Sequence, residues 1–588
     1  MIRVFRRIFN ANWTSPIVQY WPFMVAYIAL IGWQSIARNP IPRWMLIFLH
    51  AYLAASIVCW FRWSGIKWIV YSIIYVLFLT EQILSMLYGM HLSPTIFILL
   101  AETNSREASE FLQALPDKPS FWVLVRIVCL LISANVFLEI CHHRVNIWMS
   151  NKHSVLVSLR GVAALLLIGG VLFSLQYVKL FCSQEMNDID EWQSHKRNPD
   201  DIVTKLIVAA LDIHMSGKEM VKANEQVKQM IVLPQKSKDT INVILVIGES
   251  YIKEHSPLYG YQLMTTPFLC AEQQAGRLFV FTDVISPYNQ TTKVLRNIIS
   301  CNSVGNGEHW SSAPPLTAIF KKSGYEVNME DNQRMTDGQL LSNLFDFSLN
   351  TYLYNTDMVE ACYDKINEKT YEYDAQIVEN YAQELNKSGS RSIPRLVLFH
   401  LMGQHEIYKS RYPHNDTYNH FTADSISFRH EDWLTSDMRQ QIADYDNATY
   451  YNDAVIHMIM QIFREKQTVL IYLSDHGEEV YDYRPRSGRD DFQLGADIRQ
   501  SLRYQYCVPF MVWCSDAYVA AHPSIINKLS HAVKRPFMID NTCHLLFYLA
   551  NLNTPYYKSS RDILSSQYQC PPRIVNDKMN YDEVMSQK

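Results

Sequence analysis

The sequence predicts an N-terminal five-helix membrane domain followed by a soluble α/β/α domain with a central, mostly parallel sheet. Three observations support this fold class. The first 180 residues contain five long apolar segments. A strand without polar residues, Val243–Ile247, opens the second part of the chain, and strands that are buried on both faces are typical of parallel sheets. Further apolar strands then alternate with helical stretches, as βαβ units require.

The five apolar segments are each close to the roughly 20 residues that a helix needs to cross a bilayer. Trp and Tyr residues cluster near the ends of several segments, as they do at membrane interfaces. Buried core helices are the alternative, but five such segments in succession favour a membrane domain. The predicted spans are Tyr20–Ala37, Ile41–Phe61, Trp68–Met90, Phe121–Cys141 and Val155–Val178.

The charges and cysteines indicate where the two parts of the chain lie. With a cytoplasmic N-terminus, the inside segments carry more Lys and Arg than the outside loops, and five spans then place everything after Val178 on the outer side. Of the 11 cysteines, eight lie in that outer part. An oxidising compartment permits disulfides there, with connectivity and free thiols both left open. The net charge of −4 argues against a nucleic-acid partner.

The sequence divides into three regions. Residues 1–180 form the membrane anchor, which includes a helix near 94–115 that is predicted to lie on the outer membrane surface. Residues 181–239 form a polar, helix-prone bridge, and residues 240–588 form the α/β domain, with a loose tail from residue 570. The predicted strands are Val243–Ile247, Leu278–Asp283, Leu396–Leu401, Val469–Leu473 and Pro509–Trp513.

Three of these strands are followed by residues that bind metals. Glu249 follows "VILVIG", His405 follows "RLVLFHLMGQ", and Asp475 and His476 follow "TVLIYLS". In open α/β sheets, ligands bind outside the carboxyl ends of the strands. Glu, Asp and His together suit zinc or manganese better than calcium. Each residue alone is more often structural, but the three strand ends together predict a metal site.

A nucleophile is suggested by "ISPYNQTTKVLRNIIS". Thr291 and Thr292 follow a turn and precede a helical pattern, so they meet the free N–H groups and partial positive charge that favour a phosphate. An ordinary N-cap threonine is the alternative. Coordination to a divalent metal would lower the pKa of such a hydroxyl and allow it to attack.

Several motifs together resemble one family. They are "VIGESYIKEHSPLYGYQLMTTP", "TTKVL", "LMGQHEIYKSRYP", "YDNATYYNDAV", "SDHGEEVYD" and "YYKSSRDILS". The sequence is similar in these motifs to the phosphoethanolamine transferases, membrane-anchored members of the alkaline phosphatase/sulfatase superfamily. The resemblance covers essentially the whole chain and implies a catalytic domain of alkaline phosphatase/sulfatase type.

The resemblance implies a role for each matching residue. Glu249, Asp475 and His476 match the zinc ligands. Thr292 is chosen as the nucleophile and fourth ligand, with Thr291 as the alternative, and His405 matches a histidine that contacts the phosphoryl group or a second zinc. The substrate-contacting residues implied by "ETNSREASEFL" and "EDNQ" are Thr103, Glu107, Asn332 and Gln333.

One departure from the family pattern concerns the second metal. The family usually has a histidine in a Gly-His context after the Asp-His motif, whereas this chain has "RSGRDD" with Arg489. Arginine cannot bind zinc, but it can hold a phosphate through two hydrogen bonds. One zinc site is therefore expected, and a second zinc site and the family's disulfide near the nucleophile stay open.

The resemblance implies transfer of phosphoethanolamine from phosphatidylethanolamine to lipid A, lipopolysaccharide core or another surface glycan, through a covalent threonine intermediate. It also implies a multi-pass protein of the bacterial inner membrane with a periplasmic catalytic domain, expected to be a monomer. A glycerol-phosphate transferase, a phosphodiesterase and a non-catalytic scaffold are the alternatives. A sulfatase activity is disfavoured, because no Cys or Ser lies in a C/S-x-P-x-R context.

Overall fold

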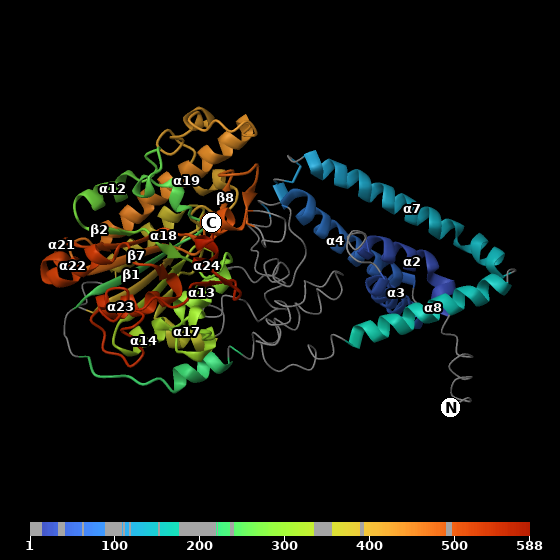
Figure 1. Cartoon of the computed structure of the whole chain (residues 1–588), viewed down its shortest axis with the longest axis horizontal. Coiled ribbons are helices and arrows are strands. Elements are labelled where there is room, and N and C mark those ends of the chain that lie inside the picture. The colour runs from blue at the N-terminus through green and yellow to red at the C-terminus, as the bar shows by residue number, and fades with distance from the viewer. Residues whose placement is uncertain are drawn as a thin grey trace. The chain divides into compact units, whose positions relative to one another are not determined.

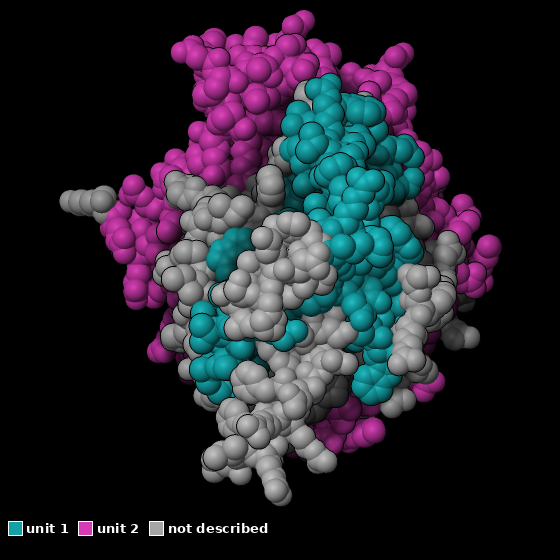
Figure 2. Space-filling model, turned by 90° about the vertical axis from the view of Figure 1, so that its right-hand side faces the viewer, with its two compact units in different colours: residues 1–217 teal, residues 218–588 magenta. Residues whose placement is uncertain are grey.

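The computed structural model divides into two compact units, residues 1–217 and residues 218–588 (Figure 2). Within them it describes residues 15–32, 41–61, 64–88, 119–150, 153–175, 240–333, 356–387, 393–489 and 497–587, with short stretches between 109 and 116 and between 219 and 235. The predicted surface helix near 94–115 and the predicted bridge fall mostly outside these residues.

The first unit is mostly helical in its described residues. Its main helices are α2 (Ser15–Gly32), α3 (Ile41–Phe61), α4 (Ser64–Tyr88), α7 (Pro119–Ser150) and α8 (His153–Ser174). Residues of α2, α3 and α4 share one apolar core. A polar contact joins α4 to α7, because Nζ of Lys67 lies 2.9 Å from Oε2 of Glu139 and the Tyr71 hydroxyl donates to Oε1 of Glu139 at 2.8 Å.

Each predicted span overlaps one of these helices, but fewer than five of the helices are both long enough and apolar enough to cross a membrane. Within the described residues, Gly65–Leu84 and Ser120–Ile147 are long and apolar enough to cross a bilayer. The apolar parts of the other three helices are shorter, namely Pro16–Ile31, Trp44–Trp60 and Arg160–Ser174.

The second unit is built on a seven-stranded sheet with the order β2-β10-β7-β1-β6-β4-β5 (Figure 1). β1 pairs in parallel with β6 and β7, and β4 pairs in parallel with β6 and β5. β10 runs antiparallel to both β7 and β2. The strands are β1 (Asn242–Gly248), β2 (Leu278–Phe281), β4 (Glu326–Asp331), β5 (Lys365–Ile366), β6 (Arg395–His400), β7 (Thr468–Ser474) and β10 (Phe510–Cys514).

Helices cover both faces of this sheet, so the central strands are buried on both sides (Figure 1). Alternate side chains of β1 enter different cores. Val243, Leu245 and Ile247 belong to one core, and Ile244 and Val246 to the other. The first core lies under α13 (Thr291–Ile299), α14 (Leu316–Lys322), α17 (Thr356–Cys362) and α23 (Thr542–Leu549); the second lies under α12 (Pro267–Gln274), α18 (Asp374–Lys387) and α19 (Ser436–Phe463).

The mostly parallel sheet and all five predicted strands are confirmed. Two strands of the sheet, β4 and β5, are not predicted by the sequence. β4 has the sequence "EVNMED", in which Asn328 and Glu330 are buried although they are polar. The expectation of a loose tail after residue 570 is wrong, because β12 (Ile574–Val575), β13 (Met579–Asn580) and α24 (Tyr581–Ser586) order that segment. The guanidinium of Arg573 holds it through Asp283 and Asp582.

Candidate metal centre and nucleophile

The carboxyl end of β1 places Glu249 at the centre of the sheet edge. The chain passes so close to β7 at Gly248 that a Cβ there would lie 2.1 Å from the Tyr472 hydroxyl. Ser250 then adopts a left-handed conformation with φ of 56°, which is uncommon for a residue other than glycine and often marks a functional site. Glu249 and Ser250 are both fully buried.

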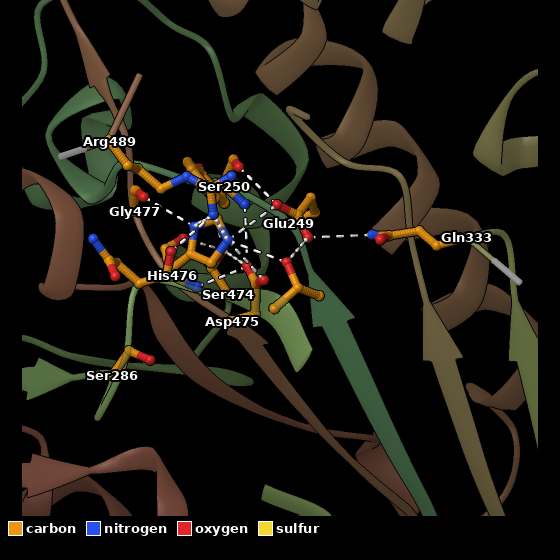
Figure 3. A network of polar contacts seen from close by, with 12 residues as sticks. Glu249, Ser250, Ser286, Gln333, Ser474, Asp475, His476, Gly477 and Arg489 are labelled. Atoms are coloured by element: carbon orange, nitrogen blue, oxygen red, sulfur yellow. Dashed lines mark hydrogen bonds and ion pairs between the residues drawn. The ribbon is translucent and has the colours of Figure 1, made fainter. Parts of the chain in front are cut away.

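The neighbouring strand β7 brings the two other predicted ligands to the same place. Gly248 and Ser474 are paired in register, so the residues that follow them lie side by side. Nε2 of His476 lies 3.2 Å from Oε1 of Glu249 and 3.1 Å from Oδ2 of Asp475. One ligand atom from each of these three buried residues lies within 4.8 Å of the others (Figure 3).

The backbone around this cluster fixes the orientation of each ligand. Nδ1 of His476 lies 3.0 Å from the carbonyl oxygen of Gly477. Because a carbonyl only accepts, Nδ1 carries the hydrogen and Nε2 presents its lone pair to the cluster. Oδ1 of Asp475 accepts from the backbone N–H of His476 at 2.7 Å and of Ser250 at 3.2 Å.

These residues fit a zinc ion. Oδ2 of Asp475 is buried and accepts no hydrogen bond in the structure. Burial, together with the charge of Glu249, raises the pKa of Asp475 well above its usual range. A divalent cation would satisfy that oxygen and balance the two carboxylates, and the set of Glu, Asp and His matches the ligands that zinc prefers.

Thr291 is the threonine whose hydroxyl reaches the cluster. It is the first residue of α13, whose N-cap is Gln290. Its Oγ1 donates to Oε2 of Glu249 at 3.0 Å and lies 3.2 Å from Nε2 of His476. Thr292 is the nucleophile expected from the sequence, with Thr291 as the alternative, and this geometry favours Thr291.

His405 lies on the loop that follows β6, and because β6 is parallel to β1 this loop starts at the same edge of the sheet as Glu249. His405 is partly buried, and its Nδ1 is buried without a hydrogen-bond partner. Burial lowers the pKa of His405 to about 4, and the nearby charges of Arg411 and Arg489 act in the same direction. A neutral imidazole can accept a proton or donate a hydrogen bond to a phosphoryl oxygen.

The predicted substrate residues separate into three groups. Gln333 touches the cluster, since its Nε2 donates to Oε2 of Glu249 at 3.3 Å (Figure 3). The same Nε2 donates to the Leu401 carbonyl at 2.8 Å. The neighbouring Asn332 is instead used by the scaffold, where its Nδ2 donates to Oδ1 of Asp374 at 2.8 Å. Thr103 and Glu107 lie outside the described residues.

Arg489 comes from the long loop after β8 (Glu479–Val480) and β9 (Ser487–Gly488). Its Nη1 donates to the Asn289 carbonyl at 2.9 Å and contacts Nε2 of His476 (Figure 3). A guanidinium therefore lies directly beside the ligands, in the region where the resemblance had implied a second zinc-binding histidine.

Two buried carboxylates near the cluster were missed by the sequence analysis. Asp374 accepts from the backbone N–H of Met402 and of Gly403, both at 2.9 Å, and so fixes the start of the His405 loop. Glu478 lies two residues after His476 and is also buried. The motif "SDHGEE" gave a signal for Glu478, whereas nothing in the sequence around Asp374 indicated its role.

A family model described as sulfatase matches residues 241–536, which cover β1 to the turn before β11 (Phe537–Met538) and so include every described residue of the cluster. The chain belongs to the sulfatase family. Membership in this family defines the fold and the position of the site, but not the group that is transferred.

The relatives of this sulfatase-family chain include named transferases. It is 24% identical to phosphoethanolamine transferase EptC of Escherichia coli (strain K12), over 84% of this chain and 81% of EptC. It is 25% identical to the Kdo(2)-lipid A phosphoethanolamine 7''-transferase of Salmonella typhimurium, over 51% of this chain and 48% of that protein.

One solved structure resembles both units of the chain. The integral membrane protein lipooligosaccharide phosphoethanolamine transferase A (EptA) from Neisseria meningitidis is 16% identical, with a TM-score of 0.53. The match covers 94% of this chain and 97% of that protein. At this identity the likeness concerns the fold, and it includes the helical part as well as the α/β part.

Proposed function

We propose that this protein is a zinc-dependent phosphoethanolamine transferase that moves the headgroup of phosphatidylethanolamine to a lipopolysaccharide or another surface glycan. The observation that carries this proposal is the position of the Thr291 hydroxyl against Glu249 and His476 at the N-terminus of α13. Relatives named as phosphoethanolamine transferases support the choice of transferred group, and one of them is named for lipid A.

Glu249, Thr291, Asp475 and His476 would hold one zinc ion. When bound, zinc supplies a positive charge that lowers the pKa of the Thr291 hydroxyl and polarises a phosphoryl oxygen. The three buried ligands and the unpaired Oδ2 of Asp475 support this assignment. The presence of Arg489 beside His476 supports a single zinc site rather than two.

Three residues around the cluster have separate roles in the proposed transfer. Oγ1 of Thr291 attacks the phosphorus of the donor, the bond to the diacylglycerol oxygen breaks, and Thr291 then carries phosphoethanolamine. An acceptor hydroxyl or phosphate later attacks the same phosphorus and frees Thr291. His405 moves a proton to or from the leaving and attacking oxygens, and Arg489 holds the phosphoryl oxygens, whose negative charge increases in the transition state.

The helical unit is proposed to be a multi-pass anchor in the bacterial inner membrane, with the catalytic unit in the periplasm. Two helices pass the test for a span, and three further apolar helices accompany them. An anchor keeps the catalytic unit where its lipid donor is concentrated, which raises the chance of a productive encounter. Thr103 and Glu107 are proposed to contact the donor headgroup.

Mass spectrometry of the protein tests the function directly. The protein would be purified from cells that make phosphatidylethanolamine, and the peptide that contains Thr291 and Thr292 would be fragmented. A phosphoethanolamine adduct on Thr291 is the expected result. A glycerol phosphate adduct on the same residue would support the same covalent mechanism but would identify the protein as a glycerol-phosphate transferase. A protein that carries no adduct and binds no zinc would contradict the proposal.

A further inference from the structure

Glu478 is a buried carboxylate two residues after His476, and the proposed transfer mechanism gives it no role. It is 2% exposed, and its Oε2 has no hydrogen-bond partner in the structure. Glu478 lies near Ser250, whose hydroxyl donates to Oε1 of Glu249 at 2.8 Å. Glu478 and a predicted zinc ligand, Glu249, therefore both lie next to the side chain of Ser250.

The next residue, Glu479, is a buried carboxylate whose oxygens both accept hydrogen bonds from the surrounding protein. Glu479 is fully buried, and Arg484 donates to it twice, at 2.6 Å and 2.7 Å. Gln505 adds a third hydrogen bond at 2.7 Å. The charge of Glu479 is thus balanced by Arg484, whereas Oε2 of Glu478 has no hydrogen-bond donor in the structure.

The guanidinium of Arg489 is near Glu478, but the hydrogen bonds of its Nη1 go to other groups. Arg489 acts on Glu478 through its charge, but its Nη1 is directed to the Asn289 carbonyl and to the ring of His476. The exposed Glu406 adds a further negative charge nearby. A buried carboxylate without a matching donor is costly, so this region is suited to receive a cation.

We propose that Glu478 binds the ammonium group of the donor and so selects phosphoethanolamine over uncharged headgroups. This inference rests on the proposed function. Only two carbons separate the ammonium nitrogen from the ester oxygen of the headgroup, so a phosphorus atom held at Thr291 keeps the ammonium close to the cluster. A primary ammonium has three N–H donors and can satisfy Oε2 with a charge-assisted hydrogen bond.

The same arrangement rejects a headgroup that lacks the amine. A neutral headgroup at this position would leave the buried Oε2 unpaired, and sites of this kind discriminate strongly against analogues that lack the hydrogen-bonding group. The expected preference for an ammonium-bearing donor is roughly 10- to 100-fold in kcat/KM, from the usual strength of a hydrogen bond to a charged group.

The test compares two donors with the full-length, zinc-loaded protein in detergent. Diacylglycerol release would be measured from phosphatidylethanolamine and from phosphatidylethanol, which has the same phosphodiester but no amine. The readout is the ratio of the two kcat/KM values. A partial loss of folded or zinc-loaded protein lowers both values by the same factor and so leaves the ratio unchanged. The variants are Glu478→Gln, which removes the charge, Glu478→Asp, which keeps it, and Asp516→Asn, which removes an exposed charge away from the cluster as the matched control.

The expected result is that Glu478→Gln reduces the ratio to within about 3-fold of unity, Glu478→Asp keeps part of the preference, and Asp516→Asn keeps all of it. A wild-type protein that cleaves both lipids equally, or a Glu478→Gln variant that keeps the wild-type ratio, would overturn the ammonium site while leaving headgroup transfer intact. A wild-type protein that cleaves neither lipid would contradict the proposed function itself.

A binding measurement covers the case in which Glu478→Gln is too slow to assay. Calorimetry would compare phosphoethanolamine with ethyl phosphate on zinc-loaded wild-type protein and on the variant. Tighter binding of phosphoethanolamine by wild type, lost in Glu478→Gln, supports the site. Equal binding of both compounds by the wild-type protein refutes it.

Discussion

Oγ1 of Thr291 lies 3.0 Å from Oε2 of Glu249, although the two residues come from different elements, the first turn of α13 and the end of β1. The contact brings a hydroxyl at a helix N-terminus to a buried carboxylate that is suited to bind a metal. Among the two adjacent threonines, this relationship favours Thr291 as the nucleophile.

We predict that Thr291→Ala reduces headgroup transfer by about 10³-fold or more, because the attacking atom is removed. Thr292→Ala is the matched control and is expected to keep activity within about 10-fold of wild type, since the attacking group stays in place. Diacylglycerol release and the covalent adduct would be measured for both variants. An inactive Thr292→Ala protein with an active Thr291→Ala protein would restore the original choice of Thr292.

Zinc removal is expected to lower the melting temperature of the protein, because the metal binds the folded state and offsets the repulsion between Glu249 and Asp475. At a zinc concentration about 100 times the dissociation constant, the stabilisation is about 2.7 kcal/mol. Asp475→Asn should abolish the increase in melting temperature on adding zinc. Asp516→Asn, at an exposed side chain, should preserve it, and an equal response of both variants to zinc would argue against the assigned ligands.

Gly403→Ala is expected to impair metal binding although Gly403 is not a ligand. Gly403 has φ of +47°, and a Cβ there would lie 2.9 Å from both the backbone N and O of Glu249. The variant must therefore displace the backbone of Glu249, a candidate ligand. Gly276→Ala is the control, because Gly276 also has a positive φ, of +74°, but its Cβ would meet nothing within 4 Å.

The measurement for this pair is zinc content per protein, with the melting temperature recorded alongside. Both variants should lose about 1 kcal/mol of stability from the left-handed backbone. Only Gly403→Ala should also lose bound zinc. If both variants retained stoichiometric zinc, the contact between the His405 loop and Glu249 would not matter for the site.

A pH-dependent contribution to stability is expected from His255. Nδ1 of His255 lies 2.7 Å from Oδ1 of Asp446, and Nε2 lies 3.1 Å from Oδ1 of Asp482. Burial alone would lower the pKa of His255, but the two carboxylates raise it from 6.5 to about 10. The protonated histidine therefore stabilises the folded state fully below pH 6.5, and this stabilisation is lost as the pH rises to about 10.

The melting temperature of wild type and His255→Gln would be compared across this range. The difference between them should be largest near pH 6, where breaking a buried pair costs about 3–5 kcal/mol, and should shrink toward pH 10. His414→Gln, at an exposed histidine, should show no such trend. A difference that grows with pH would contradict the assigned charge state.

The sequence alone predicted the strands that carry the site, because β1, β6 and β7 are continuous apolar runs and their polar ends stand out. It could not predict β4, since the buried Asn328 and Glu330 break the apolar pattern. The choice between Thr291 and Thr292 depends on which side chain the first turn of α13 directs inward, and adjacent identical residues give no signal for that direction.

The residues that support the ligands were equally hard to predict. Ser250 contributes through a left-handed backbone conformation, and Asp374 through bonds to the backbone of a distant loop. Neither property leaves a pattern in a single sequence. Glu478 and Glu479 are adjacent and chemically identical, and only the structure shows that one is compensated by Arg484 and the other is not.

The pairing of β1 with β7 also has a consequence for the biogenesis of the protein. Glu249 is synthesised early in the catalytic unit, whereas Asp475 and His476 follow only after α19 and five strands of the seven-stranded sheet have been made. A nascent chain that ends before β7 has only one of the three clustered candidate ligands. With the proposed zinc site, the metal would be bound only late in the maturation of the enzyme, and truncated or prematurely released chains are expected to accumulate without metal.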